Sequence, residues 1–339
     1  MNYKEALRQL HAGTVHPVYL CYGTESYLMD EFIEDLTRRL IPEEEREFAV
    51  GKFDLTDTPV EAAVEDAETL PFLASRKLVV ARNATFLTGA KEQGKAVHQL
   101  ERLSAYANRP MESAVLVLAV MADKLDERKK IVKQLKERAA VVVFAPLAPA
   151  ELQRWVVRGA EQRGCVMSEQ TADKLIRQTG SELQRLSAEL DKLSLYAGSS
   201  GEITPEAVEQ LAVRSTEYDI FSMIDAIAAL RIDHALQMFY ELLKRKEEPV
   251  RMVALITRQF RHILLVKALT EQGLSPQAIA AKLRLAPYAV KVTLDQARKF
   301  DHVRLRQILT LLGELDYEMK SGRVEKVFGL EMFLMKLCG

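Results

Sequence analysis

The first 147 residues alternate short apolar runs, rich in β-branched and aromatic side chains, with longer amphipathic stretches. Short apolar runs bounded by turn residues are typical of buried strands. Five runs have this character, at 18–22, 48–53, 77–81, 114–120 and 141–144. Strands that alternate with helices favour a parallel sheet covered by helices on both faces. The pattern therefore predicts an α/β domain with a five-stranded parallel sheet over residues 1–147.

The stretches between these runs carry apolar residues at helical spacing. After Gly23, for example, the residues that share one helical stripe are Leu28, Phe32, Ile33, Leu36 and Leu40. Further helices are predicted at 4–10, 60–69, 92–106 and 126–137.

No strand pattern follows Pro146 to Pro149, and the rest of the chain is predicted to be helical. Residues 148–213 indicate a small bundle with helices at 150–161, 169–178, 182–196 and 205–213. Ser181 and Thr204 stand where N-caps are expected, with Pro205 at a first helical position. Longer helices are predicted over 214–339. Because 339 residues exceed one ordinary core, we expect three domains, 1–147, 148–213 and 214–339.

The turn after the first predicted strand has the position of a phosphate-binding loop but not its residues. A P-loop reads GxxxxGK[ST], in which backbone amides and the lysine hold the phosphates. Here the chain reads GTESYLMD over 23–30, and Glu25 and Asp30 bring negative charge instead. After the run 114–120, Asp123 stands without an acidic neighbour and fits a turn residue. We therefore predict no ATPase activity.

Other chemistries lack a signature as well. The six histidines show no HxxxH or HExxH spacing, and no GxSxG or GxGxxG motif occurs. Cys21, Cys165 and Cys338 are far apart, which is typical of idle thiols in a reducing compartment. We predict no catalytic residues, no cofactor and no metal, although an active site assembled from distant segments stays open.

Composition favours a soluble globular protein. Hydrophobic residues make up 48% and charged residues 28% of the chain. No apolar run is long enough for a membrane span, which needs about 20 residues, and no signal peptide is present, so we expect a cytoplasmic protein without membrane contact. Residues 214–339 carry 20 Lys and Arg against 15 Asp and Glu, an excess of five that leans toward nucleic acid or an acidic partner.

Several stretches, taken in order, resemble the DNA polymerase III delta subunit family, the clamp-opening members of the bacterial clamp loader. They are VYLCYGTESYLMDEFI at 18–33, LPFLASRKLVVARNATFL at 70–87, DKLDERKKIVKQLKE at 123–137, GSELQRLSAELDKLSLYAG at 180–198, STEYDIFSMIDAI at 215–227 and ITRQFRHILLVKAL at 256–269. The resemblance implies a degenerate AAA+-like domain, a helical lid domain and a helical collar domain that assembles with other subunits.

The resemblance also implies the function. Such a chain binds and opens the ring-shaped sliding clamp (beta) for DNA replication, assembles with motor subunits (gamma/tau) and delta-prime, and meets primed DNA through the assembled complex at the replisome. The family lacks the P-loop, in agreement with the turn at 23–30. Two alternatives stay open: a diverged AAA+ ATPase with an unrecognised nucleotide site, and a helical adaptor unrelated to replication.

In this family a short apolar wedge enters a hydrophobic pocket of the clamp, and the matching residues here are Leu70, Pro71, Phe72 and Leu73. Pro71 is expected to end the preceding helix and to help project the apolar pair. Without the resemblance, Phe72 and Leu73 would be assigned to the core, because large apolar side chains are usually buried.

One predicted helix of the collar, 250–271, has two contrasting faces. Its apolar face contains Val253, Ile256, Phe260, Ile263 and Leu264. Arg251, Arg258 and His262 fall on the opposite side, as a solvated cationic face or as a contact with DNA phosphate or a neighbouring subunit. The sequence assigns no individual residue to DNA contact.

Overall fold

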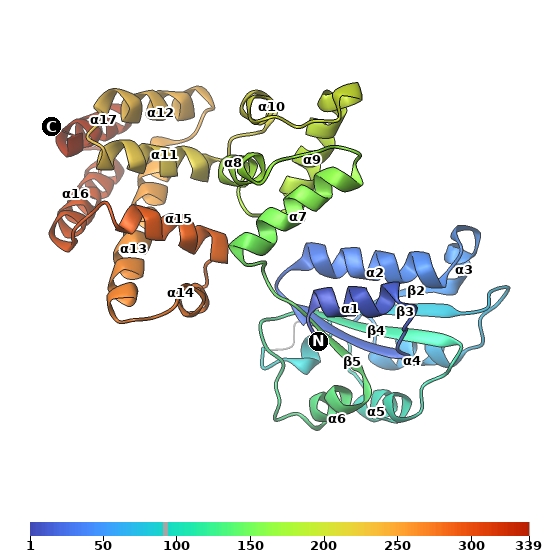
Figure 1. Cartoon of the computed structure of the whole chain (residues 1–339). Helices are drawn as coiled ribbons and strands as arrows, with labels where there is room; N and C mark the ends of the chain where they lie inside the picture. The colour runs from blue at the N-terminus through green and yellow to red at the C-terminus, as the bar shows by residue number, and fades with distance from the viewer. Residues whose placement is uncertain (91–93, 339) are drawn as a thin grey trace. The chain divides into compact units, whose positions relative to one another are not determined.

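The computed structural model describes residues 1–90 and 94–338, with the side chain of Cys338 outside the description. The chain divides into two compact units, Met1–Pro146 and Leu147–Gly339 (Figure 1). The further division of the second unit at residue 213 stays a prediction.

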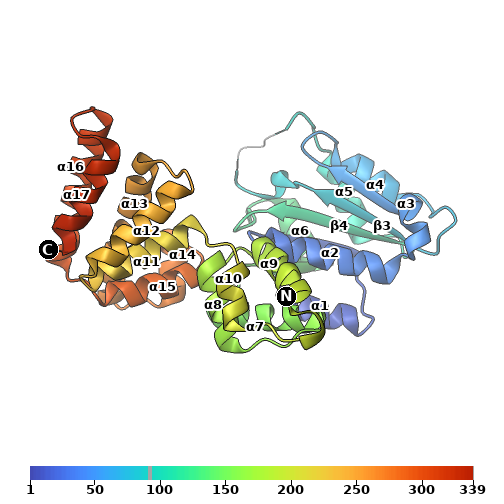
Figure 2. The same ribbon diagram turned by 90° about the horizontal axis from the view of Figure 1, so that it is seen from above.

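The first unit contains the predicted five-stranded parallel sheet. Its strands are β1 (Val18–Gly23), β2 (Val50–Asp54), β3 (Lys77–Arg82), β4 (Ala114–Met121) and β5 (Ala140–Phe144). Their order is β2-β3-β4-β1-β5, and every neighbouring pair is parallel. In both views β3 and β4 lie side by side within the sheet (Figures 1 and 2). The predicted fold class is confirmed.

Helices cover both faces of this sheet (Figure 1). One face carries α1 (Tyr3–His11) and α2 (Ser26–Leu40), and the other carries α4 (Val60–Glu68), α5 (Leu100–Asn108) and α6 (Lys130–Arg138). Shorter elements are η1 (Glu43–Glu45), α3 (Arg46–Ala49) and η2 (Thr85–Leu87). Strand β4 is buried from Ala114 to Val120 because it lies inside the sheet and has helices on both sides.

Two helices of this unit are shorter than predicted. The helix expected at 92–106 begins only at Leu100, and residues 92 and 93 lie outside the described part. Residues 94–99 are not helical, because Thr56 accepts the Lys95 amide through its carbonyl oxygen at 3.0 Å. The helix expected at 126–137 begins at Lys130, since the Asp126 carboxylate accepts the Arg128 amide in a turn.

In the described residues of the second unit the regular elements are all helices, joined by turns and loops, apart from an isolated bridge between Val166 and Glu202. Its elements are α7 (Pro149–Gln162), α8 (Glu169–Thr179), α9 (Leu183–Ala197), η3 (Gly198–Ser200), α10 (Pro205–Leu211), α11 (Thr216–Ala228), α12 (Ile232–Lys244), α13 (Pro249–Glu271), α14 (Pro276–Leu283), α15 (Pro287–Ala297), α16 (His302–Lys320) and α17 (Lys326–Cys338).

Of the two predicted N-caps in this unit, Thr204 is confirmed and Ser181 is wrong. Thr204 caps α10 by accepting the Ala207 amide, and Pro205 is the first helical residue, as predicted. Ser181 is not a cap, because α9 begins one residue later than expected, at Leu183, and its N-cap position is Glu182. The Ser181 hydroxyl is therefore not used by the helix. Within 1–90 and 94–338, no helix is both long and apolar enough to cross a bilayer.

Candidate functional site

The predicted wedge residues lie on an exposed loop. Residues 69–76, here called the wedge loop, connect the end of α4 to the start of β3. Leu70, Phe72 and Leu73 are 71%, 72% and 74% exposed, and Pro71 is half-buried. The assignment of Phe72 and Leu73 to the core is therefore wrong. Three large apolar side chains on one short loop form an exposed apolar tip.

The base of the wedge loop is held by a buried lysine that the sequence did not single out. Lys77, the first residue of β3, is 7% exposed. Its ammonium donates to Asp66 of α4, to the carboxylate at 2.7 Å and to the carbonyl oxygen at 3.1 Å. Thr69 closes the helix end by donating its hydroxyl to the Glu65 carbonyl. The signal in the sequence was a lysine at the start of an apolar strand.

Leu73 has an unusual backbone conformation. Its φ is +54°, in the left-handed region that side chains with a Cβ rarely adopt. This conformation costs about 1–2 kcal/mol for a residue other than glycine. Strain of this kind persists where surrounding contacts fix the backbone, and it is enriched at binding sites. Here the Lys77–Asp66 contact fixes the base of the loop while the strained residue sits at its tip.

The turn after β1, which lacks the P-loop residues, is short and tightly packed. Strand β1 ends at Gly23 and α2 begins at Ser26, so only two residues connect them. The Glu25 amide donates to the carbonyl oxygen of Phe144 at 3.0 Å. A Cβ on Gly23, whose φ is +151°, would lie 2.0 Å from that same oxygen. The backbone therefore closes this turn against β5 and leaves no wide loop of amides for a phosphate.

His98, Cys21 and Cys165 contribute to the packing of the fold. His98 accepts the Val60 amide at 3.1 Å, at the N-terminus of α4, and packs against the Phe86 ring. Cys21 and Cys165 are buried free thiols, and burial raises the pKa of the Cys21 thiol above its usual range. Among the described residues no group of three His, Cys, Asp or Glu side chains could hold a metal ion.

Helix α13 has the two predicted faces. Val253, Ile256, Phe260 and Ile263 are fully buried, and Leu264 is half-buried. Of the basic residues on the opposite side, one forms an ion pair at the start of the helix and two line a pocket. Arg251 pairs with Glu247 at 3.2 Å, whereas Arg258 pairs with Glu217 of α11 at 2.8 Å and lines a pocket together with His262.

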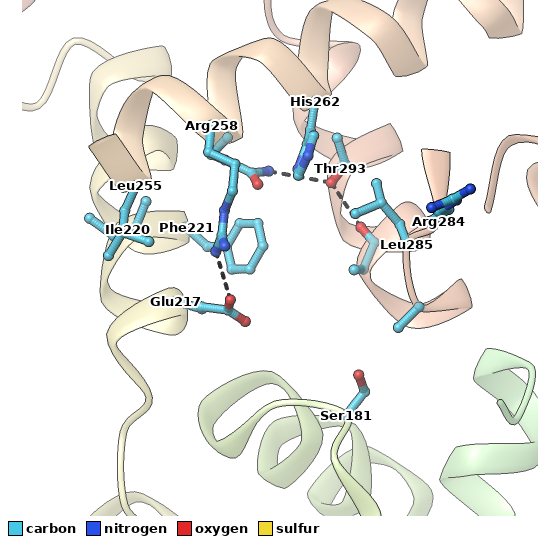
Figure 3. Close-up of a pocket in the computed structure, with 13 residues that line it drawn as sticks. Ser181, Glu217, Ile220, Phe221, Leu255, Arg258, His262, Arg284, Leu285 and Thr293 are labelled. Atoms are coloured by element: carbon cyan, nitrogen blue, oxygen red, sulfur yellow. Dashed lines mark hydrogen bonds and ion pairs between the residues drawn. The ribbon is translucent and has the colours of Figure 1, made fainter. Parts of the chain in front are cut away.

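This pocket has a volume of about 230 Å³ and lies within the second unit. Figure 3 shows Arg258 and His262 extending from α13 into the space between α11, the α14–α15 segment and Ser181. Burial, followed by the charges of Arg258 and Arg261, lowers the pKa of His262 below its ordinary value of 6.5. His262 is therefore neutral near pH 7.

Comparisons with known proteins agree on one family. The family described as DNA polymerase III, delta subunit, matches residues 19–145, and the DNA polymerase III delta subunit, C-terminal domain, matches residues 217–337. DNA polymerase III subunit delta of Bacillus subtilis (strain 168) is 38% identical over 330 residues, which cover 97% of this chain and 95% of the relative. The probable DNA polymerase III subunit delta of Aquifex aeolicus (strain VF5) is 20% identical over 260 residues, 76% of this chain and 72% of that protein.

A solved structure gives the same result. The Bacillus subtilis DNA clamp loader delta protein matches with a TM-score of 0.77 at 38% identity, over 99% of both chains. An identity above 30% over nearly the full length of both sequences makes common descent and a shared fold secure. The chain belongs to the DNA polymerase III delta subunit family.

Proposed function

We propose that this chain is the clamp-loader subunit that binds and opens the ring-shaped sliding clamp (beta) during DNA replication, and that the wedge loop makes the contact. The observation that carries the proposal is the exposure of Phe72 and Leu73 at the tip of a loop whose base is fixed. Exposed paired apolar side chains on a rigid support are typical of interface hot spots. The relative of known structure is a clamp loader delta protein, which supports the same assignment.

The apolar surface of the wedge loop is large enough to account for a stable contact with the clamp. Burying two large apolar side chains contributes about 3–6 kcal/mol, which corresponds to roughly two to four decades of affinity. A loop already fixed at its base loses little conformational entropy on binding, so more of this energy appears as affinity.

Opening a ring requires more than affinity. A partner shifts an equilibrium between closed and open rings only by binding the open form better. In this proposal the wedge loop holds the clamp while the remaining surface of the first unit fits an opened interface. The chain performs no catalysis of its own, and the closed turn at Gly23 supports this part of the proposal. Motor subunits (gamma/tau) hydrolyse ATP, delta-prime completes the loader, and primed DNA is met by the assembly at the cytoplasmic replisome.

The test is ring opening by the isolated chain. A clamp labelled with a dye pair across its subunit interface is mixed with this chain in the absence of nucleotide. We expect the wild type to increase the rate of dye separation and Phe72→Ala/Leu73→Ala to leave it at the level of the free clamp. The matched control is Leu195→Ala/Tyr196→Ala, which removes an equally exposed apolar pair from α9. Ring opening by the wedge variant at the wild-type rate would refute the proposal.

A further inference from the structure

We propose that Gly51 positions the wedge loop for clamp binding by leaving room for the Asp66 carboxylate beside β2. This inference rests on the proposed function, because it assigns a positioning residue to the loop that makes the contact. Gly51 is the second residue of β2, and the whole of α4 separates it from the wedge loop in the sequence. It acts through Asp66, which holds Lys77 at the other end of the loop.

The backbone of β2 does not itself require a glycine at position 51. Gly51 is in register with Val79 in the parallel ladder between β2 and β3, and its φ is not positive. A glycine inside a strand destabilises the strand relative to alanine, and it often marks the close approach of another group. The surroundings of Gly51 supply a reason for glycine that its backbone does not.

The group that approaches Gly51 is the Asp66 carboxylate. A Cβ at position 51 would lie 2.2 Å from the carboxylate oxygen Oδ2 and 3.1 Å from the Phe53 ring. Non-bonded heavy atoms prefer separations of about 3.5–4.0 Å, so a side chain here displaces the carboxylate. The other oxygen, Oδ1, accepts the Lys77 ammonium at 2.7 Å. One oxygen of Asp66 therefore faces Gly51 while the other holds Lys77.

Displacement of the carboxylate weakens the contact at the base of the wedge loop. Lys77 is buried, and its ammonium would keep only the Asp66 carbonyl oxygen as a partner. A buried charge that loses its counter-charge is costly, so the end of α4 or the start of β3 moves to solvate it. Either movement shifts one end of the loop that carries Phe72 and Leu73. The space at position 51 thus bears on the apolar tip.

The experiment is a double-mutant cycle in the full chain, with clamp affinity and the clamp dissociation rate as readouts. We expect Gly51→Ala to weaken clamp binding roughly threefold to tenfold, the range of one weakened hydrogen bond, mainly through faster dissociation. In the Asp66→Ala background no carboxylate is present to displace, so Gly51→Ala should change the affinity by less than about twofold. Equal losses in the two backgrounds overturn the proposal.

The matched control is Gly89→Ala. A Cβ at this glycine also meets an aspartate carboxylate, that of Asp126, but at 3.8 Å, which is ordinary contact. This variant should bind the clamp within about twofold of the wild type, as expected for a substitution that displaces nothing. A loss as large as that of Gly51→Ala would overturn the proposal.

Hydrogen exchange of the chain without the clamp separates this inference from the proposed function. Gly51→Ala should speed exchange at Lys77 and in residues 69–76, and Gly51→Ala/Asp66→Ala should exchange there as Asp66→Ala alone does. A wild type that does not bind the clamp refutes the proposed function, while the exchange still tests Gly51. Unchanged exchange in Gly51→Ala overturns the inference even when the wild type binds. If Gly51→Ala does not fold, recovery of folding on addition of Asp66→Ala supports it, and no recovery overturns it.

Discussion

The ammonium group of Lys77 lies 2.7 Å from a carboxylate oxygen of Asp66, and these two residues bracket the wedge loop. Asp66 belongs to the last turn of α4, and Lys77 begins β3. The contact joins the two ends of the segment that exposes Phe72 and Leu73. This contact ties the two ends of the loop together while its apolar tip stays exposed.

Lys77→Met keeps the length of the aliphatic stem and removes the ammonium. We expect a loss of about 1–3 kcal/mol in the free energy of unfolding, because the Asp66 carboxylate and carbonyl lose a buried donor. Clamp affinity should fall as well, although no tip residue has changed. Urea unfolding and clamp titration measure the two effects. Arg76→Met, at the exposed neighbouring position, is the control, and equal stability of both variants would contradict the role of Lys77.

His98→Ala should loosen the other end of α4. The N-cap residue Pro59 makes no side-chain hydrogen bond, so the Val60 amide depends on the His98 ring nitrogen at 3.1 Å. We expect a loss of about 1 kcal/mol, typical of a missing helix cap, and faster hydrogen exchange at Val60. His11→Ala, an exposed histidine at the end of α1, serves as the comparison. Unchanged exchange at Val60 in His98→Ala would show that the ring does not hold the helix.

Arg245→Met should make stability more dependent on pH. Asp219 has a fully buried side chain, and burial raises the pKa of its carboxyl group while Arg245, at 2.7 Å, opposes the rise. Removing Arg245 leaves the buried carboxylate without its partner, at a cost of about 2–3 kcal/mol near pH 7.

The direction follows from the protonation of Asp219 in the two states. Below the ordinary pKa of 3.8 the carboxyl is neutral in both the folded and the unfolded chain, so the cost of losing Arg245 is small. The cost grows as pH rises through the raised pKa of the folded state. Urea unfolding between pH 3 and 8 measures it, and Asp219→Asn/Arg245→Met should recover part of the loss. A deficit that does not change with pH would contradict this account.

The isolated chain should not bind ATP at micromolar concentration. The two-residue turn between Gly23 and Ser26 offers no cradle, and the Glu25 amide already donates to Phe144. A fluorescent ATP analogue measures binding with and without magnesium. Micromolar affinity would favour the alternative of a diverged ATPase.

Local patterns were sufficient to predict the sheet and most helices. The helix predicted at 205–213 corresponds to α10, which ends at Leu211, and its start was predictable because Thr204 and Pro205 act through neighbouring backbone groups. The prediction of a helix at 92–106 was wrong for residues 94–99. There the Lys95 amide donates to the Thr56 carbonyl, and the His98 ring accepts the Val60 amide, so both partners lie far away in the sequence. Propensity carries no information about such partners.

For the candidate sites, too, the sequence indicated some residues, but not the contacts that depend on distant parts of the chain. Phe72 and Leu73 could be named from their resemblance to the family, but their exposure follows from the chain path between α4 and β3. The position of Lys77 at the start of an apolar strand was visible in the sequence, but its ion pair was not, because the partner Asp66 lies on the other side of the wedge loop. The pocket beside α13 could not be predicted, since its lining residues come from separate segments that only the packing of the helices brings together.

The most direct test of the central claim is calorimetric titration of the purified sliding clamp into this chain without nucleotide. The account predicts that the wild type binds and that Phe72→Ala/Leu73→Ala loses about two to four decades of affinity. The circular dichroism spectrum of this variant should be unchanged, and Leu195→Ala/Tyr196→Ala should bind as the wild type does. Wild-type affinity in the folded Phe72→Ala/Leu73→Ala variant would contradict it.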